Sequence, residues 1–220
     1  MADFQVVTLQ VGDKYGDHYV HALRRSLAVY GHELITLGVD IPLPDLPLTG
    51  WWWKTYLFSK ELQDQLGDIF WLDLDTVIMS DLDWVEVDRF MCLRSAWYPD
   101  EWGSGVMCIP QGTGHKLWDA VEEHPQLAMK YQGPGIRFGD QGLIRRAGDE
   151  GWIEHDGLYE SMLQNRWPGK LASYKNDIVQ NGVDPESVSI VFFHGLPRPH
   201  HILEPWMDHW HEGRECLESS

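Results

Sequence analysis

The stretch DIFWLDLD, residues 68–75, decides the fold. Residues 68–74 are apolar except at their acidic ends, which predicts a buried β-strand that finishes in acid. Side chains alternate along a strand, so we expect Asp73 and Asp75 on the same side of the chain. In open α/β sheets, ligands bind beyond the carboxyl ends of the strands. The stretch therefore predicts a ligand site at residues 73–75.

The sequence on either side supplies the rest of an α/β sheet. Strands are predicted at residues 4–10 and 33–38, joined by a helix over 18–30, and this strand–helix–strand order opens an α/β fold. The other predicted helices cover residues 54–65, 115–123 and 139–146. The other predicted strands cover residues 89–94, 105–109, 152–154, 171–174 and 188–193. Residues 203–220 receive no assignment.

The composition narrows the classes of function. The chain has 220 residues, 43% of them hydrophobic, which suits one compact domain with its own core. Its net charge of −17 repels nucleic acids and anionic lipid headgroups, so we expect no nucleic-acid partner. A bound phosphate would need a local cation, either a metal ion or a placed Lys or Arg.

The cysteines and the distribution of apolar residues predict the cellular setting. Cys92, Cys108 and Cys216 are odd in number and widely spaced, which favours free thiols in a reducing compartment. The first residues lack the pattern of a signal peptide, and no apolar run is long enough for an integral membrane segment. We therefore expect a soluble cytoplasmic protein.

The chain contains 12 Trp, an unusually high number. Most are expected to fill the core, while indole faces can also stack on the C–H faces of sugar rings. Trp51, Trp52 and Trp53 are consecutive and cannot all face one core, so at least one of them should be exposed.

Asp73 and Asp75 are candidate metal ligands. Two carboxylates on one side of a crevice repel each other unless a cation lies between them, and hard oxygen ligands suit Mg²⁺ or Mn²⁺. The alternative is a pair of solvated turn residues. A second copy of the pattern, at Asp81 and Asp83, follows no apolar strand and is interpreted as turn and helix-capping chemistry.

Several blocks, in order along residues 5–200, match one known pattern. They are Val7-Thr8-Leu9 with Asp13 and Tyr15, Trp53-Lys54 with Leu57-Phe58, FWLDLDTVI (70–78), GSGVM (103–107), Asp140-Gln141-Gly142, Ser173-Tyr174-Lys175 and FHGLPRP (193–199). Together they resemble glycogenin-like (family 8) glycosyltransferases and their bacterial and phage relatives. The chain departs from that family at Gly103, where the family has Asn, and in the block from His194, which is longer in the family.

The resemblance implies a fold and a metal site. The fold would be α/β of the A-type glycosyltransferase kind: a mixed, mainly parallel sheet flanked by helices, in a single nucleotide-diphospho-sugar transferase domain over residues 1–220. Asp73, Asp75 and His194 would bind Mn²⁺ (or Mg²⁺), which would stabilise charge on a departing diphosphate.

The resemblance also implies a donor site. Lys54 and Arg198 would neutralise the diphosphate, with Lys175 as a third candidate. The other donor-binding residues would be Leu9, Val11, Gly12, Tyr15, Leu74, Gly105 and Gly195. Tyr15 could stack on a uracil or simply anchor its loop. Asp140 and Gln141 are the candidate catalytic residues near the anomeric carbon, although Asp140 could instead cap a helix.

The implied reaction is transfer of a hexose from a nucleotide diphosphate sugar, UDP-linked by this interpretation, to an acceptor hydroxyl on a glycan, a lipid-linked sugar or a protein. Two alternatives stay open. One is a sugar-nucleotide nucleotidyltransferase, and the other is a non-catalytic protein of the same fold that binds sugar nucleotides or carbohydrate.

Overall fold

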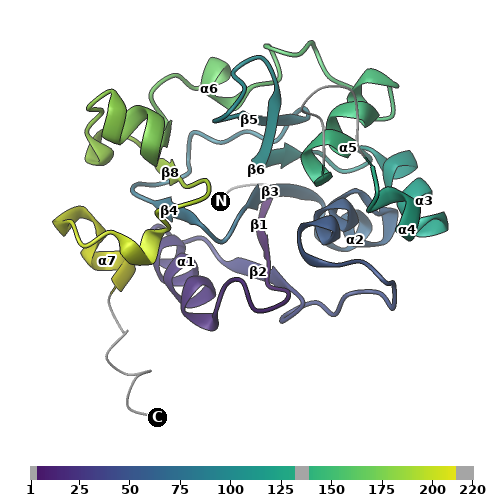
Figure 1. Cartoon of the computed structure of the whole chain (residues 1–220), viewed down its shortest axis with the longest axis horizontal. Helices are drawn as coiled ribbons and strands as arrows, with labels where there is room; N and C mark the ends of the chain where they lie inside the picture. The colour runs from purple at the N-terminus through teal and green to yellow at the C-terminus, as the bar shows by residue number, and fades with distance from the viewer. Residues whose placement is uncertain (1–3, 132–138, 212–220) are drawn as a thin grey trace.

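The computed structural model describes residues 4–131 and 139–211 (Figure 1). Strands occupy the middle of the molecule, and helices lie on both sides of them. This arrangement is the α/β sheet flanked by helices that the sequence predicts.

The larger sheet has five strands in the order β2-β1-β3-β6-β5. Their bounds are β1 (Phe4–Leu9), β2 (Leu34–Leu37), β3 (Asp68–Leu72), β5 (Met91–Arg94) and β6 (Trp102–Ile109). β1 pairs in parallel with β2 and β3, whereas β6 runs antiparallel to both β3 and β5. Four of the five strands thus point the same way, and their carboxyl ends meet at one edge.

A smaller sheet has three strands in the order β4-β8-β7. Their bounds are β4 (Thr76–Ile78), β7 (Leu171–Ser173) and β8 (Ile190–Phe192). β4 is antiparallel to β8, and β7 is parallel to it. Because β4 begins one residue after Asp75, the acidic segment connects the two sheets.

Helices and short helical turns cover both faces. The α-helices are α1 (Asp17–Val29), α2 (Lys60–Leu66), α3 (His115–Glu123), α4 (Pro125–Ala128), α5 (Gly139–Asp149), α6 (Leu163–Arg166) and α7 (Asp208–His211). The remaining helical segments are η1 (Gly50–Phe58), η2 (Tyr174–Gln180), η3 (Pro185–Ser187), η4 (Pro199–His201) and η5 (Pro205–Met207). Figure 1 shows α1 and α7 beside the smaller sheet and α2, α3 and α5 on the other side of the molecule.

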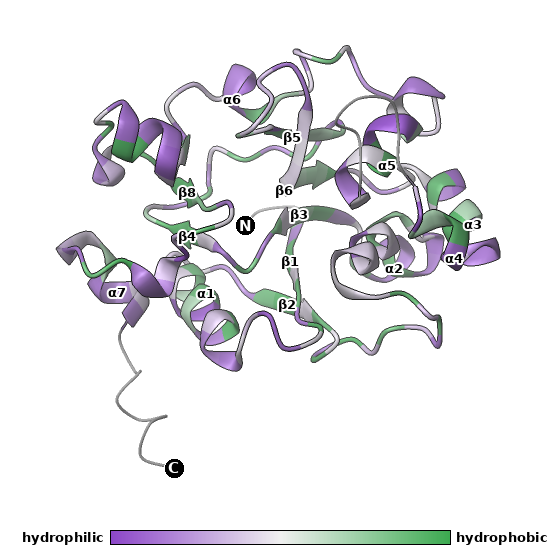
Figure 2. Cartoon of the chain, viewed as in Figure 1, coloured by the Kyte–Doolittle hydropathy of each residue, from purple (hydrophilic) through white to green (hydrophobic). Residues whose placement is uncertain are grey.

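Alternation along β3 divides the core in two. Phe70 and Leu72 belong to a cluster that includes residues of α1 and both sheets, whereas Ile69 and Trp71 face a second cluster with η1, α2, α3 and α5. All four side chains are buried. Figure 2 shows hydrophobic colouring on most of the strands and a mixture of hydrophobic and hydrophilic colouring on the helices. The first of these clusters contains side chains from both sheets and so packs them together.

Several sequence predictions are corrected by the structure. The helix predicted over 54–65 is two segments, η1 and α2, because the Ser59 side chain accepts a hydrogen bond from the Leu62 N–H (3.2 Å) and begins α2 there. The strand predicted over 68–74 ends at Leu72, so residues 73–75 form a turn rather than extended chain. Residues 152–154 are not a strand.

The described residues include the first half of the unassigned tail, residues 203–211, and two of the cysteines. η5 and α7 lie within residues 205–211. Cys92 and Cys108 are buried free thiols, while Cys216 lies outside the described residues. Within residues 4–131 and 139–211, no helix has the length and apolar character needed to cross a membrane.

Candidate functional site

Five segments meet at the carboxyl edge of the larger sheet. The turn after β3 supplies Asp73 and Asp75, the loop after β1 supplies Tyr15, and η1 supplies Lys54. The Asp73 N–H donates to the Gly105 carbonyl (2.8 Å), which fixes the turn against β6. α5 brings Asp140 to the same place. The fold thus gathers residues 15, 54, 73, 75 and 140, which the sequence predicted to act together.

Lys54 is the cation at the centre of this group. Its side chain is 9% exposed, and its Nζ lies 2.8 Å from Asp73 Oδ1 and 3.3 Å from Asp140 Oδ2. The same ammonium also donates to the Ser104 carbonyl (3.4 Å) and hydroxyl (3.3 Å). Lys54 is therefore not a helix-surface lysine, and Asp140 points into the site.

The carboxylates of this group are largely buried, and the single ammonium ion of Lys54 neutralises their negative charge only in part. Burial raises the pKa of Asp73 to about 6, with Lys54 opposing the shift and Asp75 adding to it. Burial likewise raises the pKa of Asp75, and the Tyr15 hydroxyl opposes that shift. Burial alone would lower the pKa of Lys54, but the Asp140 and Asp73 carboxylates raise it above its usual value. An added cation would relieve the repulsion between these carboxylates.

Tyr15 contacts the second carboxylate of the acidic turn. Its hydroxyl donates to Asp75 Oδ2 (2.6 Å), and burial followed by the Asp75 charge raises its pKa. Two cations flank the ring: Lys14 Nζ lies 4.7 Å and Arg198 Cζ 5.1 Å from the ring centroid. Arg198 is held there by a hydrogen bond from its NH1 to the Lys14 carbonyl (3.1 Å). Tyr15 thus anchors its loop, and Arg198 reaches the same side of the site.

His194 lies near the acidic turn but faces another way. The Phe193 N–H donates to the Asp75 carbonyl (3.1 Å), so the backbone places His194 beside the turn. Its Nε2 lies 3.0 Å from Ser173 Oγ, and its ring packs edge-on against Trp97. Its Nδ1 is buried and has no hydrogen-bond partner among the described residues.

The surroundings of His194, Asp73 and Asp75 indicate which of these side chains could bind a metal ion together. Burial and the neighbouring Lys175 lower the pKa of His194, so the imidazole is neutral at pH 7 and could serve as a ligand. In the described part of the chain, however, no three His, Cys, Asp or Glu side chains are grouped as a metal site. The Asp73 and Asp75 carboxylates suit a hard cation that keeps water and phosphate ligands. The His194 imidazole, as oriented, does not join them.

The other predicted donor-site and catalytic residues differ in how accessible their side chains are to a ligand. Leu9 and Leu74 are buried in the core, so only their backbone could reach a ligand. Val11 is partly buried, Gly12 is exposed, and Gln141 is half-buried at the start of α5. The remaining two glycines sit close to functional groups: a Cβ on Gly105 would lie 3.6 Å from Asp73 Oδ2, and one on Gly195 would lie 3.5 Å from Lys175 Nζ.

Ser104 is a site residue that the sequence reasoning missed. Its hydroxyl donates to Asp140 Oδ2 (2.7 Å), and its carbonyl accepts the Trp71 indole N–H (3.1 Å). Ser104 thereby holds both Lys54 and Asp140 in place. The available signal was a polar residue between two glycines in an otherwise apolar strand.

A polar cavity lies at the opposite edge of the sheet from Asp73 and Asp75. Its volume is about 710 Å³, and its lining includes Arg89, Gln111, His115 and Asp156. The Gln111 N–H donates to Asp68 Oδ1 (2.8 Å), which places this cavity at the amino end of β3. None of the predicted site residues lines it.

The fold that carries this site is an α/β glycosyltransferase fold, as comparison with solved structures shows. The glycosyltransferase GlyE of Streptococcus pneumoniae TIGR4 superposes with a TM-score of 0.62 at 14% identity, over 96% of this chain and 60% of that chain. Its apo form gives a TM-score of 0.54 at 15% identity, over 98% of this chain and 64% of that chain. The predicted A-type fold class is thereby confirmed.

The chain spans less than two thirds of the length of GlyE, 60% and 64% in the two structures. The sequence matches no protein-family model, and no curated protein matches it either. The likeness therefore establishes the fold, and the activity has to be argued from the site.

Proposed function

We propose that this protein is a glycosyltransferase that moves a hexose from a UDP-linked donor to an acceptor hydroxyl. One observation carries the proposal: Lys54, Asp73, Asp75 and Asp140 converge at the carboxyl edge of a sheet whose fold is that of glycosyltransferases. In this fold class, ligands bind at that edge. The resemblance to glycogenin-like (family 8) enzymes supports the choice of a UDP sugar.

The proposed reaction breaks one bond and forms another at the anomeric carbon. The bond from this carbon to the diphosphate oxygen breaks, and UDP leaves with the electron pair. The acceptor oxygen bonds to the same carbon, and its proton passes to solvent or a nearby base. Lys54 and Arg198 would offset the charge on the diphosphate, while Asp140 and Gln141 would contact the sugar.

Asp73 and Asp75 would hold the divalent cation, Mn²⁺ or Mg²⁺. Such cations are often bound by one or two carboxylates together with water and substrate phosphates. When bound, the cation would stabilise negative charge on the departing diphosphate. His194 is proposed as a third ligand, which requires its imidazole to turn away from Ser173.

The buried thiols of Cys92 and Cys108 support a reducing, cytoplasmic compartment.

The proposal is tested by thermal unfolding with UDP. UDP should raise the melting temperature when Mn²⁺ or Mg²⁺ is present and should have little effect in EDTA. Asp75→Ala should abolish the shift and lower turnover at least 100-fold, the usual cost of removing one electrostatic stabiliser. The matched control is Asp81→Ala, in the second copy of the Asp-x-Asp pattern. It should retain the shift, because Asp81 only caps a turn through the Asp83 N–H (3.2 Å).

Other outcomes would point to the alternatives. A UDP shift of equal size in EDTA would contradict the metal-dependent mechanism. Release of pyrophosphate instead of UDP on turnover would identify a nucleotidyltransferase. UDP binding with neither hydrolysis nor transfer of the donor sugar would identify a non-catalytic binding protein.

A further inference from the structure

The loop over residues 95–101, between β5 and β6, presents a large aromatic ring to solvent. The Trp97 side chain is 64% exposed, although Trp is normally mostly buried. The loop itself is well anchored. The Ser95 N–H donates to the Glu101 carbonyl (2.8 Å), and Asn176 Nδ2 donates to the Ala96 carbonyl (2.8 Å). Trp97 is therefore an exposed indole on a fixed support.

Neighbouring residues contact part of the Trp97 ring, and the rest of the ring is exposed to solvent. The His194 ring packs edge-on against it, with 4.9 Å between centroids, and Lys175 Nζ lies 5.4 Å from its ring. A Cβ on Gly195 would lie 3.9 Å from Trp97 Cζ2. These contacts fix the ring, while its exposed fraction leaves indole surface available to a ligand.

The position of Trp97 ties it to the candidate donor site. Its neighbours His194 and Gly195 directly follow Phe193, whose N–H donates to the Asp75 carbonyl (3.1 Å). The ring therefore lies next to the segment that contacts the acidic turn. A molecule stacked on Trp97 would be beside the site in which we place the donor.

A cavity lined by both polar and apolar side chains lies beside the same loop. Its volume is about 390 Å³, within the range of small-molecule sites. Ser95, Ala96 and Pro99 of the loop line it, together with Ser173, Asn176 and Asp177 from β7 and η2. Ser173 also contacts His194 (3.0 Å), which links the cavity to the neighbour of Trp97.

We propose that Trp97 and this cavity bind the acceptor, and that the acceptor is a saccharide. A pyranose has an apolar C–H face, which suits an indole, and a ring of hydroxyls, which need the polar groups that Ser173, Asn176 and Asp177 provide. The role of this saccharide as the acceptor rests on the proposed glycosyltransferase function. A hydroxyl of the bound saccharide would bond to the anomeric carbon, UDP would leave, and the hydroxyl proton would pass to solvent.

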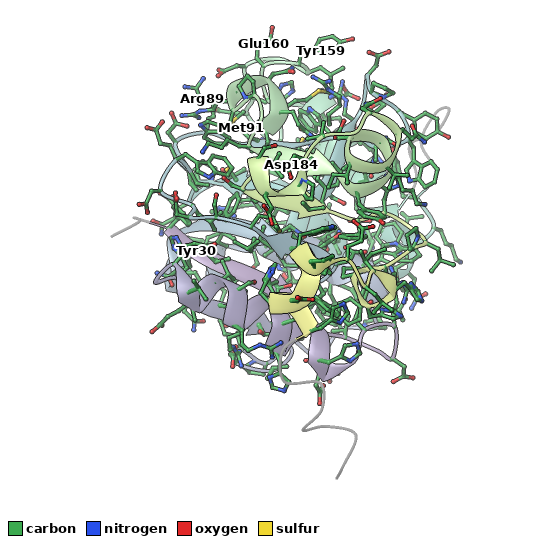
Figure 3. The ribbon with its side chains drawn as sticks, turned by 90° about the vertical axis from the view of Figure 1, so that its left-hand side faces the viewer. Tyr30, Arg89, Met91, Tyr159, Glu160 and Asp184 are labelled. Carbon is green, nitrogen blue, oxygen red and sulfur yellow. The ribbon has the colours of Figure 1, made fainter. Side chains whose placement is uncertain are left out.

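The test is binding of the full chain to an array of defined mono- to tetrasaccharides, with UDP and Mn²⁺ present. Trp97→Ala should lower the signal of the bound glycans about tenfold, near the upper end for one aromatic contact. Trp97→Phe keeps an aromatic face and should retain most of the signal. Tyr30→Ala is the matched control, because Tyr30 is an exposed aromatic side chain at the end of α1. Figure 3 shows it well apart from Tyr159, whose hydroxyl contacts Asp100 of the loop (2.8 Å).

The outcomes separate this inference from the proposed function. An empty array, or glycan signals equal in wild type and a folded Trp97→Ala, overturns the saccharide site even if UDP still binds. Glycan signals that depend on Trp97 support the site even if the protein binds no UDP, in which case the proposed transfer fails instead. In the wild type, glycans that bind should also accept hexose from the UDP donor, detected as a mass increase. Trp97→Ala should raise their KM.

Discussion

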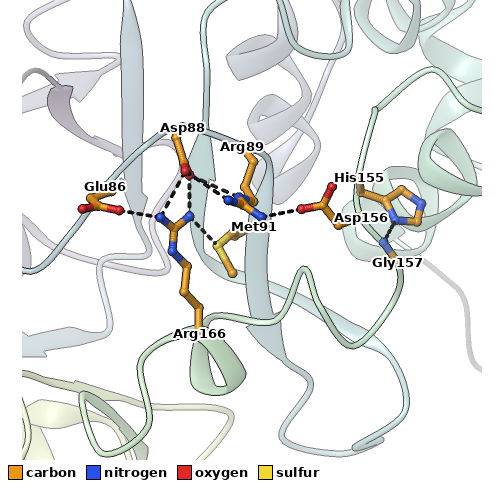
Figure 4. A network of polar contacts seen from close by, with 8 residues as sticks. All are labelled: Glu86, Asp88, Arg89, Met91, His155, Asp156, Gly157 and Arg166. Carbon is orange, nitrogen blue, oxygen red and sulfur yellow. Dashed lines mark hydrogen bonds and ion pairs between the residues drawn. The ribbon is translucent and has the colours of Figure 1, made fainter.

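Two groups of charged residues in this molecule contain the same number of carboxylates but differ in their electrostatics. The site cluster consists of Lys54, Asp73, Asp75 and Asp140. The arginine network consists of Glu86, Asp88, Arg89, Asp156 and Arg166 (Figure 4). Each group contains three carboxylates. The site cluster has one ammonium ion among them, whereas the network has two guanidinium ions.

The difference between them is burial combined with incomplete neutralisation. The side chains of Asp88 and Arg89 are 47% and 48% exposed, while that of Lys54 is 9% exposed. Hydrogen bonds from Arg166 lower the pKa of Asp88 to about 2, whereas burial raises the pKa of Asp73 to about 6. The network satisfies its charges and stabilises the surface. The site cluster holds buried carboxylates that are only partly neutralised, which is expected where a bound ligand supplies further positive charge.

Removal of the Lys54 ammonium ion should have the largest effect among the changes that test this difference between the two groups. Lys54→Met leaves Asp73 and Asp140 buried without their counterion and should lower the free energy of unfolding by about 3–5 kcal/mol. Urea denaturation at pH 7 measures it. Lys60→Met is the matched control, because Lys60 is 70% exposed and pairs only with Asp64 across one helical turn. It should cost about 0.5 kcal/mol or less.

Equal costs for these two lysines would contradict the distinction between the site cluster and the surface. A cost for Lys54→Met that falls as the pH drops below about 6 would support it. In that range Asp73 takes up a proton, and its burial no longer needs a counterion.

A smaller effect is the pH dependence of stability, which should have opposite signs in the two groups. Folded Asp73 takes up a proton below about pH 6, while the unfolded chain does so only below about pH 4. Between those values the folded state binds more protons, so wild type should gain stability relative to Asp73→Asn as pH falls from 6 to 4. The slope is at most about 1.4 kcal/mol per pH unit.

Asp88 should show the reverse. Its folded pKa of about 2 lies below its unfolded value, so its contribution is present above pH 4 and is lost as pH falls from 4 to 2. Because the side chain is nearly half exposed, the total should stay below about 1 kcal/mol. Urea denaturation of wild type, Asp73→Asn and Asp88→Asn across pH 2–7 measures both. Slopes of the same sign would contradict the comparison.

The sequence predicts the site cluster better than it predicts its surroundings. Apolar runs locate β1 and β3, and parallel strands bring residues 15, 73 and 75 to one edge whatever the details of the loops. Lys54 was predictable because cations are scarce in an acidic chain. The Asp-x-Asp pattern alone could not separate Asp73 and Asp75 from Asp81 and Asp83, and the buried strand before the first copy was the decisive difference.

What escaped prediction depends on side chains that meet only in the folded chain. The His194 imidazole faces Ser173 and Trp97, and no spacing in the sequence specifies that orientation. Ser104 gained its role from contacts with Lys54 and Asp140, distant in sequence by 50 and 36 residues. At least one exposed Trp in the 51–53 run was predicted, and Trp51 is 54% exposed. Trp97, in contrast, was indistinguishable from the Trp residues of the core.

The smallest expected effect belongs to the arginine network, and it is the sharpest test of whether that network is only structural. Arg89→Gln removes ion pairs to Asp88 (3.2 Å) and Asp156 (2.5 Å), yet it should cost no more than about 1 kcal/mol, because both partners are well exposed. The UDP-induced rise in melting temperature should be unchanged, since Arg89 lines the cavity at the opposite edge of the sheet from Asp73. Differential scanning fluorimetry with and without UDP and Mn²⁺ measures both quantities. A lost UDP response in a folded Arg89→Gln protein would mean that the two edges of the sheet are coupled. The charged groups at both edges would then have to be treated as one functional system.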